Sequence, residues 1–275
     1  MLDLLKADLK RVIKDKLTLI LGIIAVAFAL TTPLIYKLVF SLINLEDMAG
    51  MGMEMLKMQL TAKSMFFSAF SPGNNFGLIL PILVAIILCK DFNQGTVRNK
   101  IISGKSRTQI YFSLLITCTI CTCAFILAQA LLTLLCSLIF FEYQASAFTF
   151  SDFGYLMASI GFELIIYIFI CALLTFFIVF MKNAGLAIVA YFVVNFVMII
   201  FGAITQTVVT FVEPNTVTHS ILQFLNTANA FTTLTIGSTT SYNLTDILAL
   251  VLPNVAFTAL LVPFGLLVFK KKDLK

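Results

Sequence analysis

Six long apolar runs, separated by shorter polar segments, divide the chain. They cover about 17–40, 73–89, 110–141, 153–181, 184–205 and 247–269. The hydrocarbon core of a bilayer is about 30 Å thick, and roughly 20 helical residues cross it. Strands of a membrane barrel would instead alternate apolar and polar residues over about 10 positions. The pattern therefore predicts an all-α integral membrane protein with six transmembrane helices, in a single transmembrane domain over residues 1–275.

The second run is the weakest of the six. Its uninterrupted part, from Phe76 to Cys89, is short for a full crossing and follows the helix-breaking sequence SPGNN. This segment suits either a re-entrant segment or, with the apolar MFFSAF at 65–70 before the break, a broken helix.

The distribution of basic residues favours a full crossing of the second run. Lys and Arg residues that flank membrane spans stay on the cytoplasmic side. If all six runs cross, all but Lys37, Lys57 and Lys63 of the 18 basic residues lie on one side. We therefore expect both termini and the loop 90–109 in the cytoplasm, and the segment 206–246 outside.

Residues 1–16 predict a short helix that lies in the membrane interface and leads into the first span. One helical face is apolar and the other largely charged, as basic interfacial helices require. The apolar face comprises Leu2, Leu5, Leu9, Val12 and Ile13, and the charged face Asp3, Lys6, Lys10, Lys14 and Asp15. The alternative is a frayed, soluble chain end.

Composition excludes a water-soluble protein. Hydrophobic residues make up 60% of the chain and charged residues 11%, whereas soluble domains carry about 25% charged residues. The net charge of +5 follows from the membrane topology, so we expect contact with the lipid membrane and none with nucleic acid. The predicted location is a cell membrane, specifically the bacterial cytoplasmic membrane.

Groups able to perform bond chemistry are scarce. His219 is the only histidine, which excludes a multi-histidine metal site and leaves a Ser-His-Asp triad without a supporting motif. Cys118, Cys121 and Cys123 lie close together, but no His or carboxylate is near them in sequence, so they are interpreted as packing residues. We expect no catalytic residue, no metal and no cofactor on this chain.

Glu163 is the only acidic residue inside a predicted span. An acid near the bilayer centre costs about 2.5–3.5 kcal/mol on insertion scales, so such residues usually face a cavity or a partner. Glu163 is therefore a candidate cavity residue that contacts cargo or carries a proton, together with Asn195 of the fifth run. The alternative is a protonated or hydrogen-bonded packing residue, with Asn195 as its partner.

The loop 90–109 has the pattern of a short amphipathic helix. Gly95 and Gly104 bracket a segment with apolar residues at helical spacing and basic residues around them. The apolar residues are Val97, Ile101 and Ile102, and the basic ones Arg98, Lys100, Lys105 and Arg107. Such a helix would offer a docking surface, whereas the plainer interpretation is a positive loop that only fixes topology.

The loop sequence DFNQGTVRNKIISGKSRTQIYFS resembles the first cytoplasmic loop of ABC-2-type permeases, the membrane subunits of ATP-binding-cassette exporters. The resemblance implies that this loop is a coupling helix that contacts a separate ATPase. The positions it assigns to the contact are Asp91, Phe92, Gly95, Thr96, Arg98, Asn99, Lys100, Gly104, Ser106 and Arg107.

The same resemblance implies the partners. Two copies of an ATPase subunit would bind ATP and Mg, and a second permease copy, identical or similar, would complete the complex. The sequence NKIISGKS ends like a phosphate-binding loop but lacks its first glycine and its α/β context. The chain itself is therefore expected not to be an enzyme.

The cargo is less defined by the sequence. Compact members of this family export amphipathic or antimicrobial peptides or hydrophobic drugs, or give self-immunity, and the resemblance implies such a cargo here. A cation exporter of the same family is the next alternative. An ATPase-independent channel or proton-coupled transporter that uses Glu163 is the alternative from another class.

Overall fold

The computed structural model describes residues 1–42, 62–70, 75–140, 150–181, 183–214, 216–231 and 244–271. These residues form helices and contain no strand. The helices are α1 (Leu2–Lys14), α2 (Lys16–Leu42), α4 (Ala62–Phe70), α5 (Asn75–Asn93), α6 (Thr96–Ile102), α7 (Arg107–Phe140), α8 (Phe150–Met181), α9 (Ala184–Phe211), α10 (Val217–Ala228) and α11 (Leu244–Lys271).

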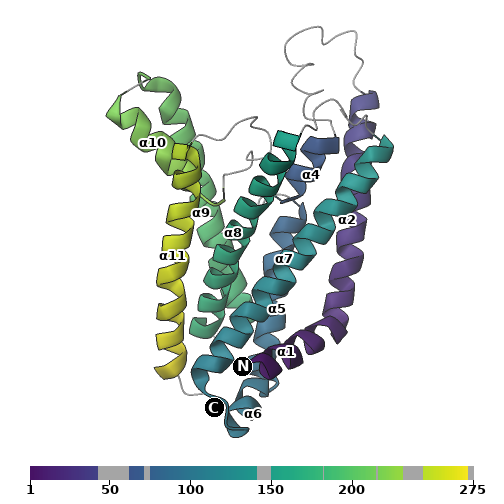
Figure 1. Ribbon diagram of the computed structural model, residues 1–275, viewed down its shortest axis with the longest axis vertical. Helices are drawn as coiled ribbons and strands as arrows, with labels where there is room; N and C mark the ends of the chain where they lie inside the picture. Colours follow the sequence, from purple (N-terminus) through teal and green to yellow (C-terminus); the bar gives the residue numbers. More distant parts are fainter. Residues whose placement is uncertain are drawn as a thin grey trace.

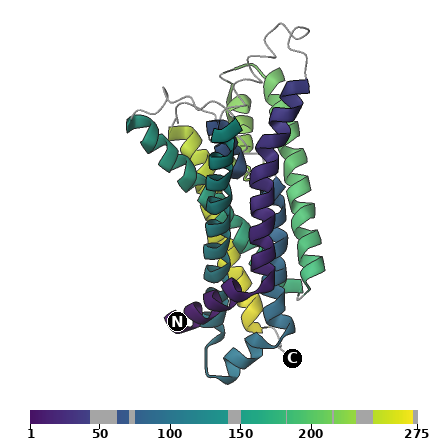
Figure 2. The ribbon, with the colours of Figure 1, turned by 90° about the vertical axis from the view of Figure 1, so that its right-hand side faces the viewer.

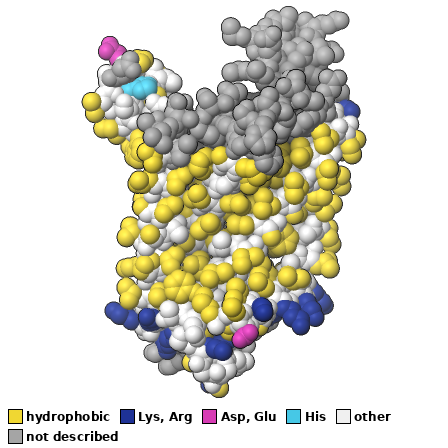
Figure 3. Space-filling view, in the orientation of Figure 1, with side chains coloured by type: hydrophobic (Ala, Val, Ile, Leu, Met, Phe, Trp, Pro, Cys, Tyr) yellow, Lys and Arg dark blue, Asp and Glu magenta, His cyan; other side chains and the backbone are white. Residues whose placement is uncertain are grey.

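Within the described residues, five helices are long and apolar enough to cross a membrane: α2, α7, α8, α9 and α11. They stand side by side in one bundle (Figure 1). Apolar side chains form a broad belt across the face of the bundle seen in Figure 3, and basic side chains gather at its lower end. The prediction of an all-α, multi-pass membrane protein is therefore confirmed. The shorter α5, which contains the second predicted run, is not among the five, so a sixth crossing stays a prediction.

Helix α8 forms the centre of the bundle. It packs against α5, α7, α9 and α11. In its most apolar stretch of 18 residues, 56% is buried inside the protein, whereas the corresponding share for α11 is 11%. Ile166, Tyr167 and Ile170 are fully enclosed, whereas Leu252 and Leu260 of α11 are exposed. Exposed apolar side chains on the outer helices suit contact with lipid, because no hydrophobic effect favours their burial when the surroundings are hydrocarbon.

Helix α1 runs across the lower end of the bundle, at a steep angle to α2 (Figures 1 and 2). Leu4, Asp8 and Val12, spaced by four residues, are buried against the bundle, while Leu2 and Ile13 are exposed. The expected apolar face is thus turned partly outward, and an acid lies on the buried face. The placement of α1 in the membrane interface stays a prediction.

The predicted outer segment 206–246 is helical in part. Helix α9 continues to Phe211, and α10 packs on α9 and α11 at the upper end (Figure 1). The Thr216 hydroxyl accepts a hydrogen bond from the His219 amide at 3.2 Å, which caps α10. Residues 215 and 232–243 lie outside the described residues, as do 43–61, 71–74, 141–149, 182 and 272–275.

The contact of Gly265 with Tyr111 gives a first prediction. A Cβ atom at Gly265 would collide with the Tyr111 hydroxyl, and Tyr111 is fully buried. We expect Gly265→Ala to lower the free energy of unfolding of the detergent-purified chain by about 1–3 kcal/mol, because overpacking forces the Tyr111 ring to move. The measurement is the melting temperature. Tyr111→Phe, which removes the clashing oxygen, is expected to restore stability in the double variant.

The matched control for this prediction is Gly22→Ala in α2, where an added Cβ meets nothing within 4 Å. It should be neutral or slightly stabilising, because Ala favours the helix over Gly. Equal melting temperatures for Gly265→Ala and Gly22→Ala would show that the α7–α11 contact is not tight.

Candidate functional site

The loop between α5 and α7 folds as a short helix between two glycine turns. Gly95 precedes α6 with φ 67°, and Gly104 follows it with φ 82°. Both values lie in the left-handed region, where a side chain would be strained. The two glycines therefore let the chain leave α5, form α6 and return into α7, and the short helix predicted from the sequence is present.

Only part of α6 faces outward. Val97 is buried and Ile101 is half-buried against the bundle, whereas Arg98, Asn99 and Ile102 are exposed. The apolar ridge expected to meet a partner is thus largely used to hold α6 on the bundle. The outward surface is polar and basic, with Ile102 as its exposed apolar residue.

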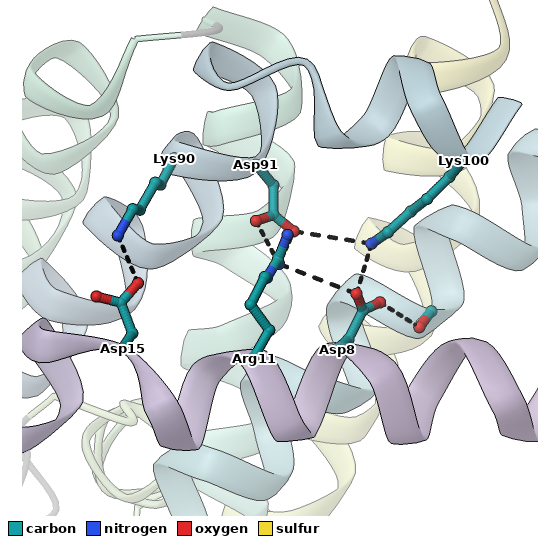
Figure 4. Close-up of polar contacts among 7 residues, drawn as sticks. Asp8, Arg11, Asp15, Lys90, Asp91 and Lys100 are labelled. Carbon is teal, nitrogen blue, oxygen red and sulfur yellow. Dashed lines mark hydrogen bonds and ion pairs between the residues drawn. The ribbon is translucent and has the colours of Figure 1, made fainter. Parts of the chain in front are cut away.

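A charge cluster, defined here as Asp8, Arg11, Asp91 and Lys100, joins α1 to α5 and α6 (Figure 4). Arg11 pairs directly with Asp91. Lys100 Nζ lies 2.7 Å from Asp8 Oδ1 and 3.8 Å from Asp91 Oδ2. Arg11 Nη2 lies 3.9 Å from Asp8 Oδ1, which closes the ring of charges. The backbone of α1 packs on α2 and α7, so these long side chains make its link to α6.

Three of the four side chains in the charge cluster are buried, whereas Arg11 is 35% exposed, and the charges balance. The side chains of Asp8 and Asp91 are 3% and 4% exposed and that of Lys100 is 10% exposed. Two carboxylates face two cations, which offsets the cost of removing them from water. The Lys100–Asp8 contact is an ion pair without good hydrogen-bond angles, but the Ser113 hydroxyl of α7 donates to Asp8 Oδ2 at 2.7 Å.

The acids of this region differ in their electrostatic environment. Burial raises the pKa of Asp91 above its ordinary value, and the hydrogen bond and charge of Arg11 oppose that rise. The hydrogen bond from Lys90, 2.6 Å from Asp15 Oδ2, lowers the pKa of Asp15. The Asp15–Lys90 pair is thus a second link between the α1–α2 corner and the end of α5.

The same loop is fixed to the last helix. Arg107 Nη1 donates to the carbonyl oxygen of Lys270 at 2.7 Å and lies 3.4 Å from that of Phe269. Carbonyls at a helix C-terminus lack intrahelical partners and carry partial negative charge, so a guanidinium suits them. The Phe92 ring packs edge-on against Phe269, with ring centres 6.2 Å apart. The α6 region is therefore held between the first and last helices.

The residues predicted for an ATPase contact separate into two groups. Those on the outward surface are Arg98, Asn99, Gly104 and Ser106; those that point inward or are partly covered are Asp91, Phe92, Gly95, Thr96, Lys100 and Arg107. Sequence reasoning missed Asp8 and Arg11 as partners of Lys100 and Asp91. It also missed the Ser113 hydrogen bond to Asp8 and the separate Asp15–Lys90 pair. One signal was available, since Asp8 lies one turn from both Leu4 and Val12 on the buried face of α1.

Residues 73–275, well over half of the chain, match a family described as "Protein of unknown function (DUF2705)". The chain belongs to the DUF2705 family. No curated protein matches this DUF2705 chain. The matched region begins just before α5 and contains Asp91 and Lys100, whereas α1, with Asp8 and Arg11, precedes it.

The two residues predicted to line a cavity lie in the bundle of this DUF2705 protein, away from the charge cluster. Glu163 of α8 is 4% exposed, and its Oε2 atom has no hydrogen-bond partner among the described residues. Asn195 of α9 is also buried, and its amide donates to the Tyr191 hydroxyl at 3.5 Å. No hydrogen bond joins Glu163 to Asn195 in the described part of the chain.

A small cavity lies instead beside the charge cluster, between α1, α5 and α7. It encloses about 20 Å³, which is room for one water molecule, and is bounded by Arg11, Val84 and Thr117 among others. The Thr117 hydroxyl has no partner among the described residues. Groups of three or more metal-ligating side chains are absent from the described residues. The described side chains around this cavity thus form ion pairs and hydrogen bonds that join α1, α5, α6 and α7.

Proposed function

We propose that this DUF2705 protein is the membrane-spanning subunit of an ATP-driven exporter, and that α6 is the element on which a separate ATPase acts. The observation that carries the proposal is the position of α6. It has an outward basic surface on one side and an ion pair from Lys100 to the first helix on the other, and the residues that flank it, Phe92 and Arg107, contact the last helix. Movement of such a helix by a partner can be passed to the first and last helices of the bundle. The ABC-2-type loop sequence of this segment supports the same assignment.

The proposal includes a topology. All six apolar runs cross, both termini lie in the cytoplasm, and the lower end of Figure 1 is the cytoplasmic end. The concentration of Lys and Arg at that end supports this orientation. Helix α5 has 19 residues, about 28 Å at 1.5 Å per residue, of which the last four are polar or lie beside charged residues, so α4 and α5 together make the second crossing. The membrane is the bacterial cytoplasmic membrane.

The complex contains two ATPase copies, which bind ATP and Mg, and a second permease copy, identical or similar. Closure of the ATPases moves α6, and the bundle switches between inward and outward access. The chain itself makes and breaks no bond, and transport follows from different affinities for cargo in the two states. An amphipathic or antimicrobial peptide or a hydrophobic drug is the first candidate cargo, and a cation the next.

The test is affinity purification of the tagged chain from its native membrane in mild detergent, with identification of the proteins that accompany it. A stoichiometric ATP-binding-cassette protein is the expected result, and a second permease would identify a heterodimer. A monodisperse, intact chain without an ATPase would contradict the proposal.

A self-sufficient channel or proton-coupled transporter is the second candidate function. The buried, unpartnered carboxylate oxygen of Glu163 favours it, because charged groups inside membranes usually belong to transport pathways. Flux through liposomes that contain the purified chain alone would support this function, and Glu163→Gln should then remove the flux.

A further inference from the structure

Helix α4 ends inside the bundle. Its last residue, Phe70, is fully buried, and the Phe70 carbonyl accepts a hydrogen bond from the Tyr167 hydroxyl of α8 at 2.8 Å. Tyr167 lies near the middle of α8, which runs from Phe150 to Met181. The chain resumes as α5 at Asn75, so two separate helices occupy the path of one span (Figure 1). The carbonyl end of a helix carries partial negative charge.

Glu163 lies on the same face of α8 as Tyr167, one helical turn nearer the upper end. Its side chain is 96% buried, with Oε2 unpartnered among the described residues. Because the Tyr167 hydroxyl donates to the last carbonyl of α4, Glu163 lies on the face of α8 that is turned toward that end of α4. A buried carboxyl group whose Oε2 atom lacks a partner and a helix end of partial negative charge therefore belong to the same side of α8.

The described helices around Glu163 supply no opposite charge at this depth. The basic residues of α2, α5, α7 and α11 are at their ends, namely Lys16, Lys37, Lys90, Arg107, Lys270 and Lys271. The bundle around α8 otherwise offers tyrosines, cysteines and small polar side chains. Lys63, in the first turn of α4, is the nearest basic residue to Phe70 along that helix, and it must be tested as an internal partner.

We propose that Glu163 and the carbonyl end of α4 form a binding site for a small monocation. Oxygen atoms from a carboxylate and a helix C-terminus are suitable ligands, and broken helices in transporters place such carbonyls at their ion sites. The positive charge comes either from an inorganic ion or from an ammonium group on a larger cargo. The second source rests on the proposed exporter function, whereas binding of an inorganic ion does not.

The test is chemical labelling of the purified, liposome-reconstituted full chain, without any ATPase. Dicyclohexylcarbodiimide modifies buried carboxyl groups, and peptide mass spectrometry locates the label, with Glu163→Gln as the blank. We expect Glu163 to be labelled in N-methylglucamine chloride. This salt keeps the ionic strength constant, and its cation is too bulky for a site that takes a small monocation. Sodium chloride or methylammonium chloride should reduce this labelling at least about tenfold, equivalent to 1.4 kcal/mol.

The arms of the experiment separate the two sources of charge. Protection by sodium identifies an inorganic ion, and protection by methylammonium alone identifies an ammonium group. Tyr167→Phe, which leaves the Phe70 carbonyl without its hydroxyl donor, should change the half-protecting concentration of the effective probe at least about threefold. Lys63→Gln should leave both labelling and protection unchanged.

Two results would overturn the cation site. The first is equal labelling of Glu163 in all three salts. The second is a Glu163 that is unreactive in the natural chain but is labelled in Lys63→Gln, since Lys63 would then be the cation. Neither result depends on an ATPase, so the exporter function can fail or hold independently.

Discussion

Lys100→Met is expected to lower the free energy of unfolding by about 3 kcal/mol, because removal of one partner leaves a buried charge uncompensated. Lys100 Nζ is 2.7 Å from Asp8, whose side chain is 3% exposed, and Met keeps most of the side-chain volume. Arg11, at 3.9 Å from Asp8, already pairs directly with Asp91 and cannot replace the lost cation fully. The measurement is thermal unfolding of the chain in detergent.

Two further variants make the Lys100 prediction specific. Lys105→Met removes an exposed lysine three residues after α6 and should change stability by less than about 0.5 kcal/mol. Asp8→Asn with Lys100→Met removes both buried charges, so the double variant should lose clearly less than the sum of the two single losses. Strict additivity would show that the two side chains do not interact.

Arg98→Glu is expected to abolish co-purification of the ATPase while leaving membrane insertion intact. Arg98 is exposed on the outward surface of α6 and takes no part in the charge cluster. Reversal of a charge across a complementary interface costs several kcal/mol, and 2.8 kcal/mol already weakens binding about 100-fold. The measurement is the ratio of ATPase to permease after affinity purification.

Lys10→Glu is the matched control for Arg98→Glu. It makes the same charge change on an exposed lysine of α1, away from α6, and should leave the ATPase ratio unchanged. A normal ratio for Arg98→Glu would contradict the coupling role of α6. Loss of the ATPase in both variants would point instead to a general requirement for positive charge at this end.

The helices were largely predictable because their apolar runs and breakers are local signals. The run at 184–205 became α9, and Gly95 and Gly104 marked the ends of α6, since left-handed backbone favours glycine. The direction in which α6 turns was not predictable. Val97 faces the bundle because α5 and α7 cover it, and no local pattern specifies which side of a seven-residue helix will be covered.

The charge cluster could not be predicted from the sequence either, because its residues are distant along the chain. Asp8 and Lys100 are separated along the chain by α2, α4 and α5, and only tertiary packing brings them within 2.7 Å. Sequence reasoning identified Asp91 and Lys100 as candidate contacts with an ATPase. In the structure their side chains pair with Arg11 and Asp8 of α1. Glu163 was identifiable as the only acid in a predicted span, but the bond between Tyr167, one turn away, and the end of α4 was not.

The charge cluster also constrains how related sequences can vary. Arg11 and Asp8 precede the segment that defines the DUF2705 family, while Asp91 and Lys100 lie within it. A homologue that loses the acid at position 91 or the base at position 100 should have changed its first helix at the same time. In an alignment of full-length relatives, positions 11 and 91 should therefore covary, as should 8 and 100, and a fragment limited to 73–275 would inherit two charges without their partners.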